Sequence, residues 1–435
     1  MKNIVVIGTG YVGLVSGAGM SDFGNNVCCV DVDKDKIDLL QNGIIPIYEP
    51  NLKELVDRNV KSKRLKFSIN IEDAIKSAEV IFIAVGTPED KNGNADLTYV
   101  LQVAELIGKS LNSYKVVCTK STVPIGTGKR IIDFINKYNT NNIDYDYCSN
   151  PEFLREGKAV ADFLKPDRVV LGTSSKKAFE YLRDVYRTLY INNTPLINTT
   201  IETAEMIKYA SNAFLALKIS YINEVANLCD EIGADIAVVS DALGSDGRIS
   251  PKFLHPGPGF GGSCFPKDTK ALINVAKKHN VSMNTIDAAI KTNNNQRIRM
   301  LRKIEKLLEG KLNKRTIAVL GLAFKQETDD VRESASIDMI LGLIKKGANI
   351  KAYDPVANDS MKKIIPTIDY KLNWQDAVKD CDAVVIMTEW NEFRGMDLYE
   401  LKKLMSKPII LDTRNILNLA ELKELEFTFD NVGRK

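Results

Sequence analysis

The first part of the chain alternates short, continuous apolar runs with longer segments of helical periodicity. The runs fall at residues 3–8, 27–33, 80–86 and 115–122, and a further run follows at 168–172. A strand of a parallel sheet has helices on both faces, so it is apolar along its whole length instead of alternating with polar residues. The pattern therefore predicts an α/β domain built on a doubly wound parallel sheet.

The same arrangement returns after residue 315. Segments at 316–325, 349–355 and 381–390 resemble the first three runs in sequence. Between the two regions, apolar residues from Ile201 to Ile232 recur at helical spacing with no internal glycine or proline. This spacing predicts a helix of about 30 residues, roughly 45 Å long. A helix of this length typically spans domains or packs against a second subunit.

We accordingly expect an α/β fold of two Rossmann-like doubly wound lobes, joined by a long central helix and a helical middle domain. The expected boundaries are 1–200 for the first lobe, 201–310 for the middle domain and 311–435 for the second lobe. A chain of 435 residues is long enough for two or three domains with large cores.

Composition and charge exclude several functional classes. The net charge is only +3, with acids and bases intermixed, and no apolar run is as long as a membrane span. We therefore expect no nucleic-acid partner and no membrane partner. The seven cysteines are scattered, without C-x-x-C pairs or zinc-type spacing, which predicts no metal site and a reducing, cytoplasmic location. Because the chain has only two histidines, acid–base chemistry must depend on carboxylates, lysine, cysteine or water.

A glycine motif follows the first predicted strand. Gly8, Gly10 and Gly13 have G-x-G-x-x-G spacing, and Asp31 ends the second strand. In a dinucleotide-binding fold the glycines let a pyrophosphate approach the N-terminus of a helix, and the acid accepts hydrogen bonds from the ribose. Asp31 would also repel a 2′-phosphate, which favours NAD over NADP; the alternative is a structural turn with a surface aspartate. Lys36 either lies near the adenosine or is solvated.

The corresponding turn of the second lobe differs. It keeps only Gly321 and contains Lys325. We expect that this lobe does not bind a dinucleotide pyrophosphate in the same way. A lysine at this point suits another phosphate-bearing ligand, or it simply faces solvent.

One cysteine stands out from the other six. Cys264 follows four glycines and precedes a segment of helical pattern in which Pro266 is close to the first position. A thiol at a helix N-terminus is favoured as the nucleophilic thiolate, and glycines let a ligand approach the backbone. Asp268 lies one helical turn further on. The alternative, a buried inert thiol, is the interpretation we give to the cysteines in apolar strand and helix patterns.

Two pairs of polar residues have helical i, i+4 spacing. Lys208 and Asn212 form a polar face on the long predicted helix, where they can donate hydrogen bonds to a negatively charged oxygen or form a solvated edge. Glu152 and Glu156 follow a proline turn. If that segment is helical, both carboxylates point the same way and can hold a water or carry protons; the alternative is a charged helix start.

Taken together, these motifs resemble the nucleotide-sugar 6-dehydrogenase family over nearly the whole chain. The segments GTGYVG, STVPIGT, NPEFLREG, GFGGSCFPKD, GLAFK, TDDVRESAS and DTRN occur in the order typical of the family. The resemblance implies an oxidoreductase with NAD as cofactor, which converts UDP-glucose to UDP-glucuronate by a four-electron oxidation. It also implies a thiohemiacetal and then a thioester on Cys264. GDP-mannose is the alternative substrate, with the same mechanism.

The resemblance also implies roles for individual residues and a homodimer built on the long helix, in which Arg248 is contributed across the interface. The catalytic residues are Cys264, Lys208, Asn212, Asp268, Thr122, Glu152 and Glu156. The cofactor-binding residues are Gly8, Gly10, Tyr11, Val12, Gly13, Asp31, Lys36, Thr87, Ser121, Thr122, Glu156, Lys267 and Arg332. The substrate-binding residues are Glu152, Phe153, Leu154, Lys208, Asn212, Arg248, Phe253, Gly257, Phe260, Gly261, Phe324, Lys325 and Arg414.

Two other classes of function compete with this interpretation. A nucleotide-binding regulator without turnover would need no Cys264, Lys208, Asn212 or Asp268, yet all four are present. A two-electron dehydrogenase that stops at an aldehyde or ketone would need no thiol beside the nicotinamide. Counting the NADH formed per sugar separates these classes from the four-electron oxidation.

Overall fold

The computed structural model describes residues 1–90 and 93–434. The chain divides into two compact units, Met1–Ser211 and Asn212–Lys435. The boundary falls inside helix α9 (Ile201–Ile232), whose 32 residues confirm the long helix expected from the sequence. The division into three domains at residues 200 and 310 stays a prediction.

The first unit contains one sheet with strand order β3-β2-β1-β4-β5-β6-β7-β8 among its described residues. All five predicted strands are present, as β1, β2, β4, β5 and β7, whereas β3, β6 and β8 were not expected. The strands are β1 (Asn3–Ile7), β2 (Asn26–Val30), β3 (Leu65–Ser68), β4 (Val80–Ile83), β5 (Lys115–Thr119), β6 (Tyr145–Ser149), β7 (Val169–Gly172) and β8 (Leu196–Thr199).

The predicted parallel sheet is confirmed, with one antiparallel pairing near one edge. Strands β1 to β6 are parallel, but β7 pairs with β6 in the antiparallel direction and β8 then runs parallel to β7. Apolar runs reveal that a strand is buried and do not reveal its direction, so the sequence pattern could not show this reversal.

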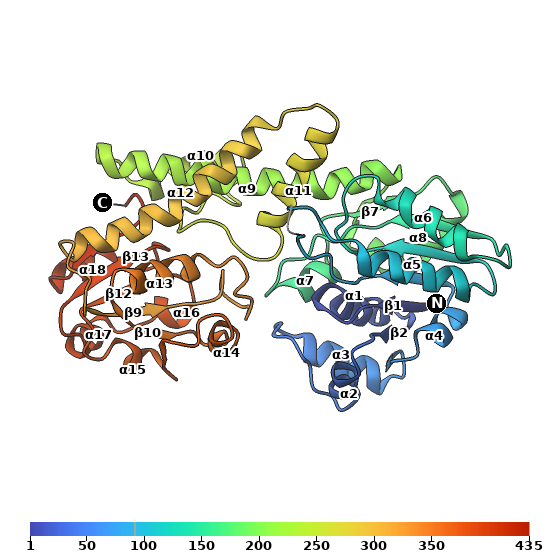
Figure 1. Ribbon diagram of the computed structural model, residues 1–435, viewed down its shortest axis with the longest axis horizontal. Helices are drawn as coiled ribbons and strands as arrows, with labels where there is room; N and C mark the ends of the chain where they lie inside the picture. The colour runs from blue at the N-terminus through green and yellow to red at the C-terminus, as the bar shows by residue number, and fades with distance from the viewer. Residues whose placement is uncertain (91–92, 435) are drawn as a thin grey trace. The chain divides into compact units, whose positions relative to one another are not determined.

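Helices cover both faces of the first sheet, as a doubly wound fold requires. Along β1, Ile4 and Val6 belong to one apolar cluster and Val5 and Ile7 to another, because successive side chains point to opposite faces. The first face is covered by α1 (Tyr11–Asp22), α2 (Lys34–Gln41), α3 (Leu52–Lys61), α7 (Ala159–Leu164) and α8 (Lys176–Val185). The second is covered by α4 (Ile71–Ser77), α5 (Thr98–Ser110) and α6 (Thr127–Tyr138) (Figure 1).

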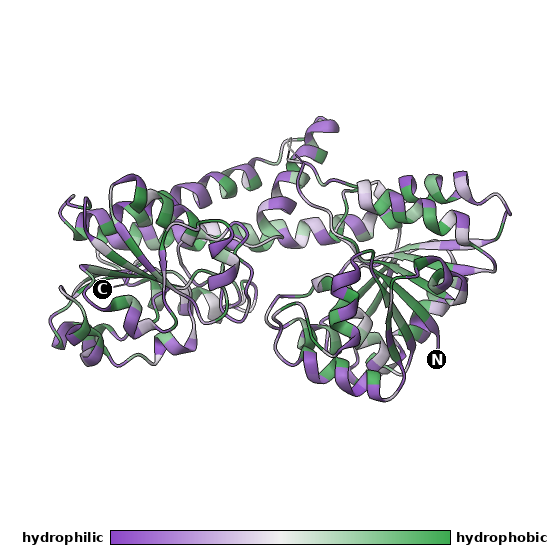
Figure 2. Ribbon diagram, turned by 60° about the horizontal axis from the view of Figure 1, so that its bottom comes forward, coloured by the Kyte–Doolittle hydropathy of each residue, from purple (hydrophilic) through white to green (hydrophobic). Residues whose placement is uncertain are grey.

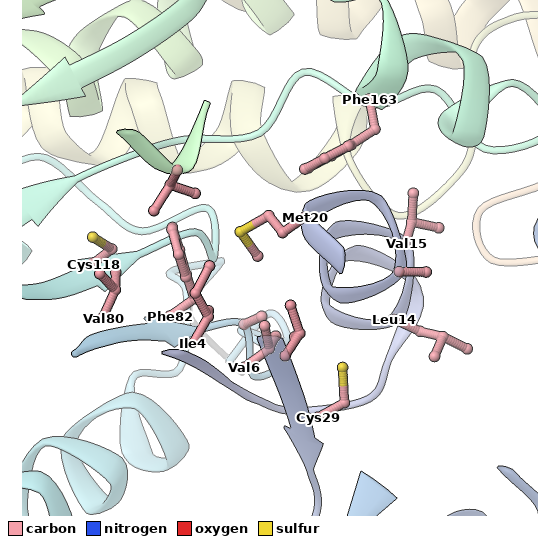
Figure 3. Close-up of a cluster of buried hydrophobic side chains, with 14 of the residues drawn as sticks. Ile4, Val6, Leu14, Val15, Met20, Cys29, Val80, Phe82, Cys118 and Phe163 are labelled. Atoms are coloured by element: carbon pink, nitrogen blue, oxygen red, sulfur yellow. The ribbon is translucent and has the colours of Figure 1, made fainter. Parts of the chain in front are cut away.

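The core of this unit is formed by strands and the apolar faces of helices. Figure 2 shows the strands largely in green and the helices in alternating green and purple, which is the pattern of helices with one buried face. In the close-up of Figure 3, Met20 of α1 lies beside Phe82 of β4, and Phe163 of α7 approaches from the other side. Each such side chain contributes roughly 1.5–3 kcal/mol when it is fully buried.

The second unit repeats the design with a smaller sheet, which confirms the predicted second lobe. Its strand order, within the described residues, is β11-β10-β9-β12-β13-β14, and every pairing is parallel. The strands are β9 (Thr316–Leu320), β10 (Asn349–Tyr353), β11 (Asp369–Tyr370), β12 (Ala383–Ile386), β13 (Ile409–Asp412) and β14 (Thr428–Asp430).

Helices again cover both faces, and the predicted helical middle contributes to one of them. Met300 and Ile304 of α12 (Asn284–Leu307) pack in one apolar cluster with β9 residues Ile317 and Val319. That face also carries α13 (Ala335–Lys345) and α14 (Asn358–Lys362). The other carries α15 (Trp374–Val378), α16 (Asn391–Arg394), α17 (Leu398–Leu404) and α18 (Leu419–Glu424). The remaining helices among the described residues are α10 (Ile236–Ser245), α11 (Phe265–Lys278) and a short 3-10 helix, η1 (Arg187–Asn192).

Candidate functional site

The glycine motif forms a tight turn between β1 and α1. Gly8 has φ of +102°, and a Cβ there would lie 2.7 Å from the Ala84 carbonyl oxygen. A Cβ at Gly13 would lie 1.9 Å from the carbonyl oxygen of Gly8, so glycine is required for the helix to approach the turn. A Cβ at Gly10 would meet no atom within 4 Å. The turn therefore leaves bare backbone open at the N-terminus of α1, where amide groups and the helix dipole favour a phosphate.

Asp31 lies immediately after β2 and supports this turn. One of its carboxylate oxygens accepts hydrogen bonds from the Thr9 amide (2.7 Å) and hydroxyl (2.8 Å). Burial opposes ionisation of Asp31, but the hydrogen bonds from Thr9 and Asp33 and the charge of Lys36 outweigh it and lower its pKa. Lys36 Nζ lies 3.9 Å from the carboxylate, and its role at a dinucleotide stays a prediction. The site thus holds a fixed negative charge that can accept ribose hydroxyls.

The next strand ends along the sheet carry the other expected cofactor contacts. The Thr87 hydroxyl, after β4, donates to the carbonyl oxygen of Thr122, after β5, over 2.9 Å. The Ser121 hydroxyl donates to the Val85 carbonyl oxygen over 2.7 Å. Because β1, β4 and β5 are neighbours, these loops and the glycine turn meet at the carboxyl edge where strand order reverses, which is where ligands bind in open α/β sheets.

The NPEFLREG segment differs from the sequence expectation. Residues 151–155 have no helical structure, so Glu152 and Glu156 are not brought onto one face by helical spacing. A turn follows at residues 156–157, and α7 begins only at Ala159. Glu152 is buried and accepts hydrogen bonds from Lys208 Nζ (2.8 Å) and from the Leu154 amide. Glu156 is partly exposed in the turn that precedes α7.

Lys208 is therefore not a solvated helix edge. Its side chain is only 4% exposed, and its Nζ also lies 5.4 Å from the centre of the Phe153 ring. Arg168 covers the same ring at 3.6 Å. The lysine, the carboxylate of Glu152 and the aromatic ring form a compact buried group. Tyr11 of α1 contacts the NPEFLREG segment too, because its hydroxyl oxygen accepts from the Gly157 amide over 2.7 Å.

The sequence analysis missed several buried charged residues of the first unit, among them Lys120 and Glu205. Lys120 directly precedes Ser121 and donates to Asn150 Oδ1 over 3.2 Å. Burial lowers the pKa of Lys120 to about 8, although the charge of Glu152 opposes this. The only sequence signal for Lys120 was a lysine at the end of an apolar strand pattern.

Glu205 anchors the long helix to the N-terminus of α6. Its two carboxylate oxygens accept from the amides of Gly126 (2.6 Å) and Gly128 (2.8 Å), and the side chain is buried. Burial raises the pKa of Glu205 to about 7, although the two hydrogen bonds act in the opposite direction. The start of α6 leaves amide groups without partners inside the helix, but no signal in the sequence indicated that Glu205 would bind them.

In the second unit, Cys264 occupies the N-cap of α11, as the sequence predicted. Pro266 lies at the start of that helix, and the Asp268 amide donates to the Cys264 carbonyl oxygen over 2.8 Å. Cys264 Sγ lies 3.6 Å from the Ser263 hydroxyl. Cys264 is partly exposed, whereas the other six cysteines are buried, and none of the seven is in a disulfide. The only accessible thiol among the described residues is thus placed at the positive end of a helix dipole.

The carboxylate of Asp268 is completely buried beneath this helix start. One oxygen accepts from Asn212 Nδ2 and the other from Lys267 Nζ, each over 2.7 Å. The predicted pair Lys208 and Asn212 therefore has two different acidic partners, Glu152 and Asp268. Lys208 and Asn212 each donate a hydrogen bond to a buried carboxylate. The predicted polar face on α9 is therefore not a solvated helix edge.

The glycine loop before Cys264 packs tightly against the second lobe. A Cβ at Gly261 would lie 2.2 Å from the Glu333 carbonyl oxygen, and one at Gly262 would lie 2.8 Å from the Phe324 ring. Arg414 donates to the carbonyl oxygens of Met387 (2.7 Å) and Phe324 (2.8 Å), beside Gly257. The structure thus brings together the predicted substrate residues Gly257, Phe260, Gly261, Phe324, Lys325 and Arg414.

Other predicted residues have local partners. Phe253 and Phe260 both pack against the ring of Phe265, with centroids 6.1 Å apart in each case. The guanidinium groups of Arg248 and Arg332 are exposed, and each pairs with an aspartate two residues earlier. The main chain of Arg332 contacts the glycine loop, because its carbonyl oxygen accepts from the Gly262 amide over 2.9 Å.

The second lobe contains a counterpart of Asp31 with different bonding. Asp354 follows β10, is buried, and accepts from the amides of Leu322 and Ala323 and from the indole of Trp390 through one oxygen. Its other oxygen accepts from two amides of the turn that follows it. The carboxylate is fully used by the protein, which agrees with the expectation that this lobe does not bind a dinucleotide in the manner of the first.

Residues 1–90 and 93–434 contain no cluster of metal ligands, because no three or more of their His, Cys, Asp or Glu side chains are arranged to hold a metal ion. Among the helices of the same residues, none combines the length and apolar character that crossing a bilayer demands.

Two α/β units, one with a dinucleotide turn and the other with a thiol at a helix N-terminus, define a nicotinamide-dinucleotide-dependent oxidoreductase. Family comparisons specify the class further. The NAD binding, central and UDP binding domains of the UDP-glucose/GDP-mannose dehydrogenase family match residues 2–190, 202–295 and 318–419. The chain belongs to this family.

Individual relatives extend over the whole chain. UDP-glucose 6-dehydrogenase TuaD of Bacillus subtilis (strain 168) is 47% identical over 100% of this chain and 94% of its own length. A UDP-glucose 6-dehydrogenase of Rhizobium meliloti (strain 1021) is 46% identical over 99% of both chains. The solved structure of a UDP-glucose dehydrogenase from Pyrobaculum islandicum superposes with a TM-score of 0.93 at 35% identity, covering 100% of this chain and 98% of that one.

Proposed function

We propose that this enzyme oxidises UDP-glucose to UDP-glucuronate in an NAD-dependent, four-electron reaction that passes through a covalent adduct on Cys264. The observation that carries the proposal is the placement of Cys264. It is the accessible thiol at the N-cap of α11, with a glycine loop before it and the buried Asp268 one turn later. The relatives named UDP-glucose 6-dehydrogenase support the choice of substrate.

The chemistry balances in four steps. The C6 alcohol of the sugar loses a hydride and a proton and becomes an aldehyde. The Cys264 thiolate adds to the aldehyde carbon, and the new oxyanion takes a proton to give a thiohemiacetal. Loss of a second hydride and a proton leaves a thioester, and water then breaks the C–S bond to release the carboxylate and the thiol. A bound nicotinamide dinucleotide supplies the acceptor for each hydride.

The buried polar groups have assigned roles in these steps. Lys208 and Asn212 donate hydrogen bonds to the oxyanion, because an ammonium and an amide in a dry environment stabilise developing negative charge. Asp268 orients Asn212 and Lys267, to which it is hydrogen-bonded. Thr122, Glu152 and Glu156 hold the hydrolytic water and carry protons.

The choice of NAD over NADP rests on Asp31. Hydrogen bonds from Thr9 hold the carboxylate of Asp31 in its ionised form, and this charge would repel a 2′-phosphate. The positive charge of Lys36, 3.9 Å away, would weaken this repulsion in part. The UDP group is assigned to the second unit, where Lys325 and Arg414 supply positive charge beside the Phe324 ring. The assignment of the dinucleotide to the first unit and of UDP to the second is supported by the NAD binding and UDP binding domains that the family comparison matched.

We also propose a homodimer that is formed through α9. Phe214, Tyr221 and Leu228 are spaced by seven residues and are 60%, 53% and 57% exposed. Residues at this spacing lie on one helix face, and an exposed apolar stripe of this kind is typical of an interface. In the dimer, Arg248, which is 90% exposed, would be contributed to the neighbouring site.

A stoichiometric assay tests the proposal. With limiting UDP-glucose, the wild-type enzyme should form two NADH per sugar, and Cys264→Ser should not complete the reaction. Cys229→Ala, which alters a buried thiol of the same unit, serves as the matched control. Full turnover by Cys264→Ser would refute the thioester route, and turnover confined to GDP-mannose would refute the substrate.

A further inference from the structure

The glycine loop is held by a set of buried amide side chains that no step of the proposed reaction uses. The Gly257 amide donates to Asn223 Oδ1 (2.8 Å), and the Gly257 carbonyl oxygen accepts from Gln296 Nε2 (2.9 Å). The Phe260 amide donates to Asn293 Oδ1 (2.7 Å), and the Phe260 carbonyl oxygen accepts from Asn293 Nδ2 (3.1 Å). All four backbone groups of these two loop residues are therefore satisfied by side-chain amides.

Amide side chains can satisfy the N–H and C=O groups of the loop because each combines a donor and an acceptor without a charge. Asn223, Asn293 and Gln296 are at most 3% exposed, so a charged replacement would have to be desolvated. Asn293 and Gln296 are three residues apart on α12 and thus share a helix face. Gln296 Oε1 in turn accepts from Asn227 of α9 over 2.8 Å, which ties the two helices together behind the loop.

Of these amide side chains, Asn293 makes the shortest hydrogen bond to the loop, 2.7 Å from the Phe260 amide. Gly259 has φ of +110°, and a Cβ there would lie only 2.8 Å from Asn293 Oδ1. The amide therefore presses against bare backbone at the sharpest part of the loop, while it bonds both backbone groups of the next residue. Arg297 adds a bond to the same Phe260 carbonyl oxygen over 2.8 Å. This two-point pairing of Asn293 with one residue fixes both the position and the rotation of the peptide units around Phe260.

We propose that Asn293 is a positioning residue that sets the affinity for the nucleotide sugar by holding the glycine loop in its binding shape. The inference rests on the proposed function, in which the loop from Gly257 to Gly261 lines the nucleotide sugar. Asn293 acts through the main chain of Phe260 and has no contact with the reacting atoms. The same reasoning predicts that NAD affinity, which we assign mainly to the glycine turn and Asp31 of the first unit, changes little when Asn293 is replaced.

The decisive variant is Asn293→Asp. One carboxylate oxygen still accepts from the Phe260 amide, but the other replaces a donor and faces the Phe260 carbonyl oxygen, which repels it. Asn294→Asp is the matched control, because it introduces the same charge one residue away on the exposed side of α12. Asn293→Ala removes both bonds without adding charge and serves if the aspartate variant does not fold.

Calorimetric titration with UDP-glucose and steady-state kinetics give the readouts. We expect Asn293→Asp and Asn293→Ala to bind UDP-glucose at least about tenfold more weakly, with a matching rise in KM, a kcat within about threefold of wild type, and unchanged NAD affinity. Asn294→Asp should behave as the wild type does. A purely structural role would lower kcat through loss of active protein and would leave KM unchanged, and that result would overturn the proposal.

Two further outcomes separate this inference from the proposed function. If the wild type binds UDP-glucose but does not oxidise it, the proposed function fails, and the calorimetric series alone decides the role of Asn293. Equal UDP-glucose affinity in Asn293→Asp and Asn294→Asp would overturn the role of Asn293 while the reaction stands. If the wild type does not bind UDP-glucose, both proposals are wrong.

Discussion

Replacing Lys208 with methionine tests a buried ion pair of the first unit. Lys208 and Glu152 are 4% and 5% exposed, and the two charged atoms are 2.8 Å apart. Removing one partner of a buried pair typically costs about 3–5 kcal/mol, because the remaining charge stays desolvated. Lys120 lies close enough for the charge of Glu152 to act on it, so it compensates in part. We therefore expect Lys208→Met to lower the free energy of unfolding of the first unit by about 3 kcal/mol.

The positions of the tryptophans make this measurable. Trp374 and Trp390 both lie in the second unit, so their fluorescence follows that unit, whereas far-ultraviolet circular dichroism follows both. In urea, Lys208→Met should shift the circular-dichroism transition to a lower denaturant concentration, with a smaller effect on fluorescence. Adding Glu152→Gln removes the isolated charge and keeps an acceptor for the Leu154 amide, so the double variant should regain part of the loss.

An exposed pair supplies the control. Lys53→Met breaks the ion pair with Asp57 on the surface of α3, where both side chains are about half exposed, and should leave the transition nearly unchanged. If Lys208→Met and Lys53→Met shift the transition equally, the Lys208–Glu152 pair is not buried in the folded protein. The reasoning fails equally if the double variant is less stable than either single variant.

Three other expectations follow from the first unit. Asp31→Asn should lower the preference for NAD over NADP by at least about tenfold in kcat/KM, because the charge that repels a 2′-phosphate is lost. Gly13→Ala should abolish NAD binding in direct titration and destabilise the unit by roughly 1–3 kcal/mol, since its Cβ would overlap the Gly8 carbonyl oxygen. The folded-state pKa of Glu205 is raised from 4.5 to about 7, so the folded state holds this proton more tightly than the unfolded chain. Stability relative to Glu205→Gln should therefore fall as pH rises from about 4.5 to 7, by about 3 kcal/mol in total, and a flat difference across that range would contradict the assignment.

The features that a sequence reveals are those encoded within one element or one turn. The spacing of Gly8, Gly10, Gly13 and Asp31 predicted the turn after β1, because steric limits on the backbone leave few alternatives at such positions. The start of α11 was predicted in the same way, from the glycines before Cys264 and the proline after it. Both predictions depend only on residues that are close together in the sequence.

Pairings between distant segments could not be predicted in this way. The i, i+4 spacing of Lys208 and Asn212 indicated a common face but not that Glu152 binds the first and Asp268 the second. The spacing of Glu152 and Glu156 was compatible with a helix, whereas residues 151–155 have no helical structure. Each of these outcomes depends on which segments the sheet brings side by side, and residue periodicity carries no information about that.

The bonding of Asp354 has a consequence for attempts to redesign the second lobe. Restoring the missing glycines after β9 would reopen space at that turn. Both carboxylate oxygens of Asp354, however, already accept hydrogen bonds from five donors of the second lobe. Diverting these oxygens to a coenzyme would leave interior amides and an indole unsatisfied. The design of a second coenzyme site would therefore require a newly introduced hydrogen-bond acceptor, because Asp354 is not available for that role.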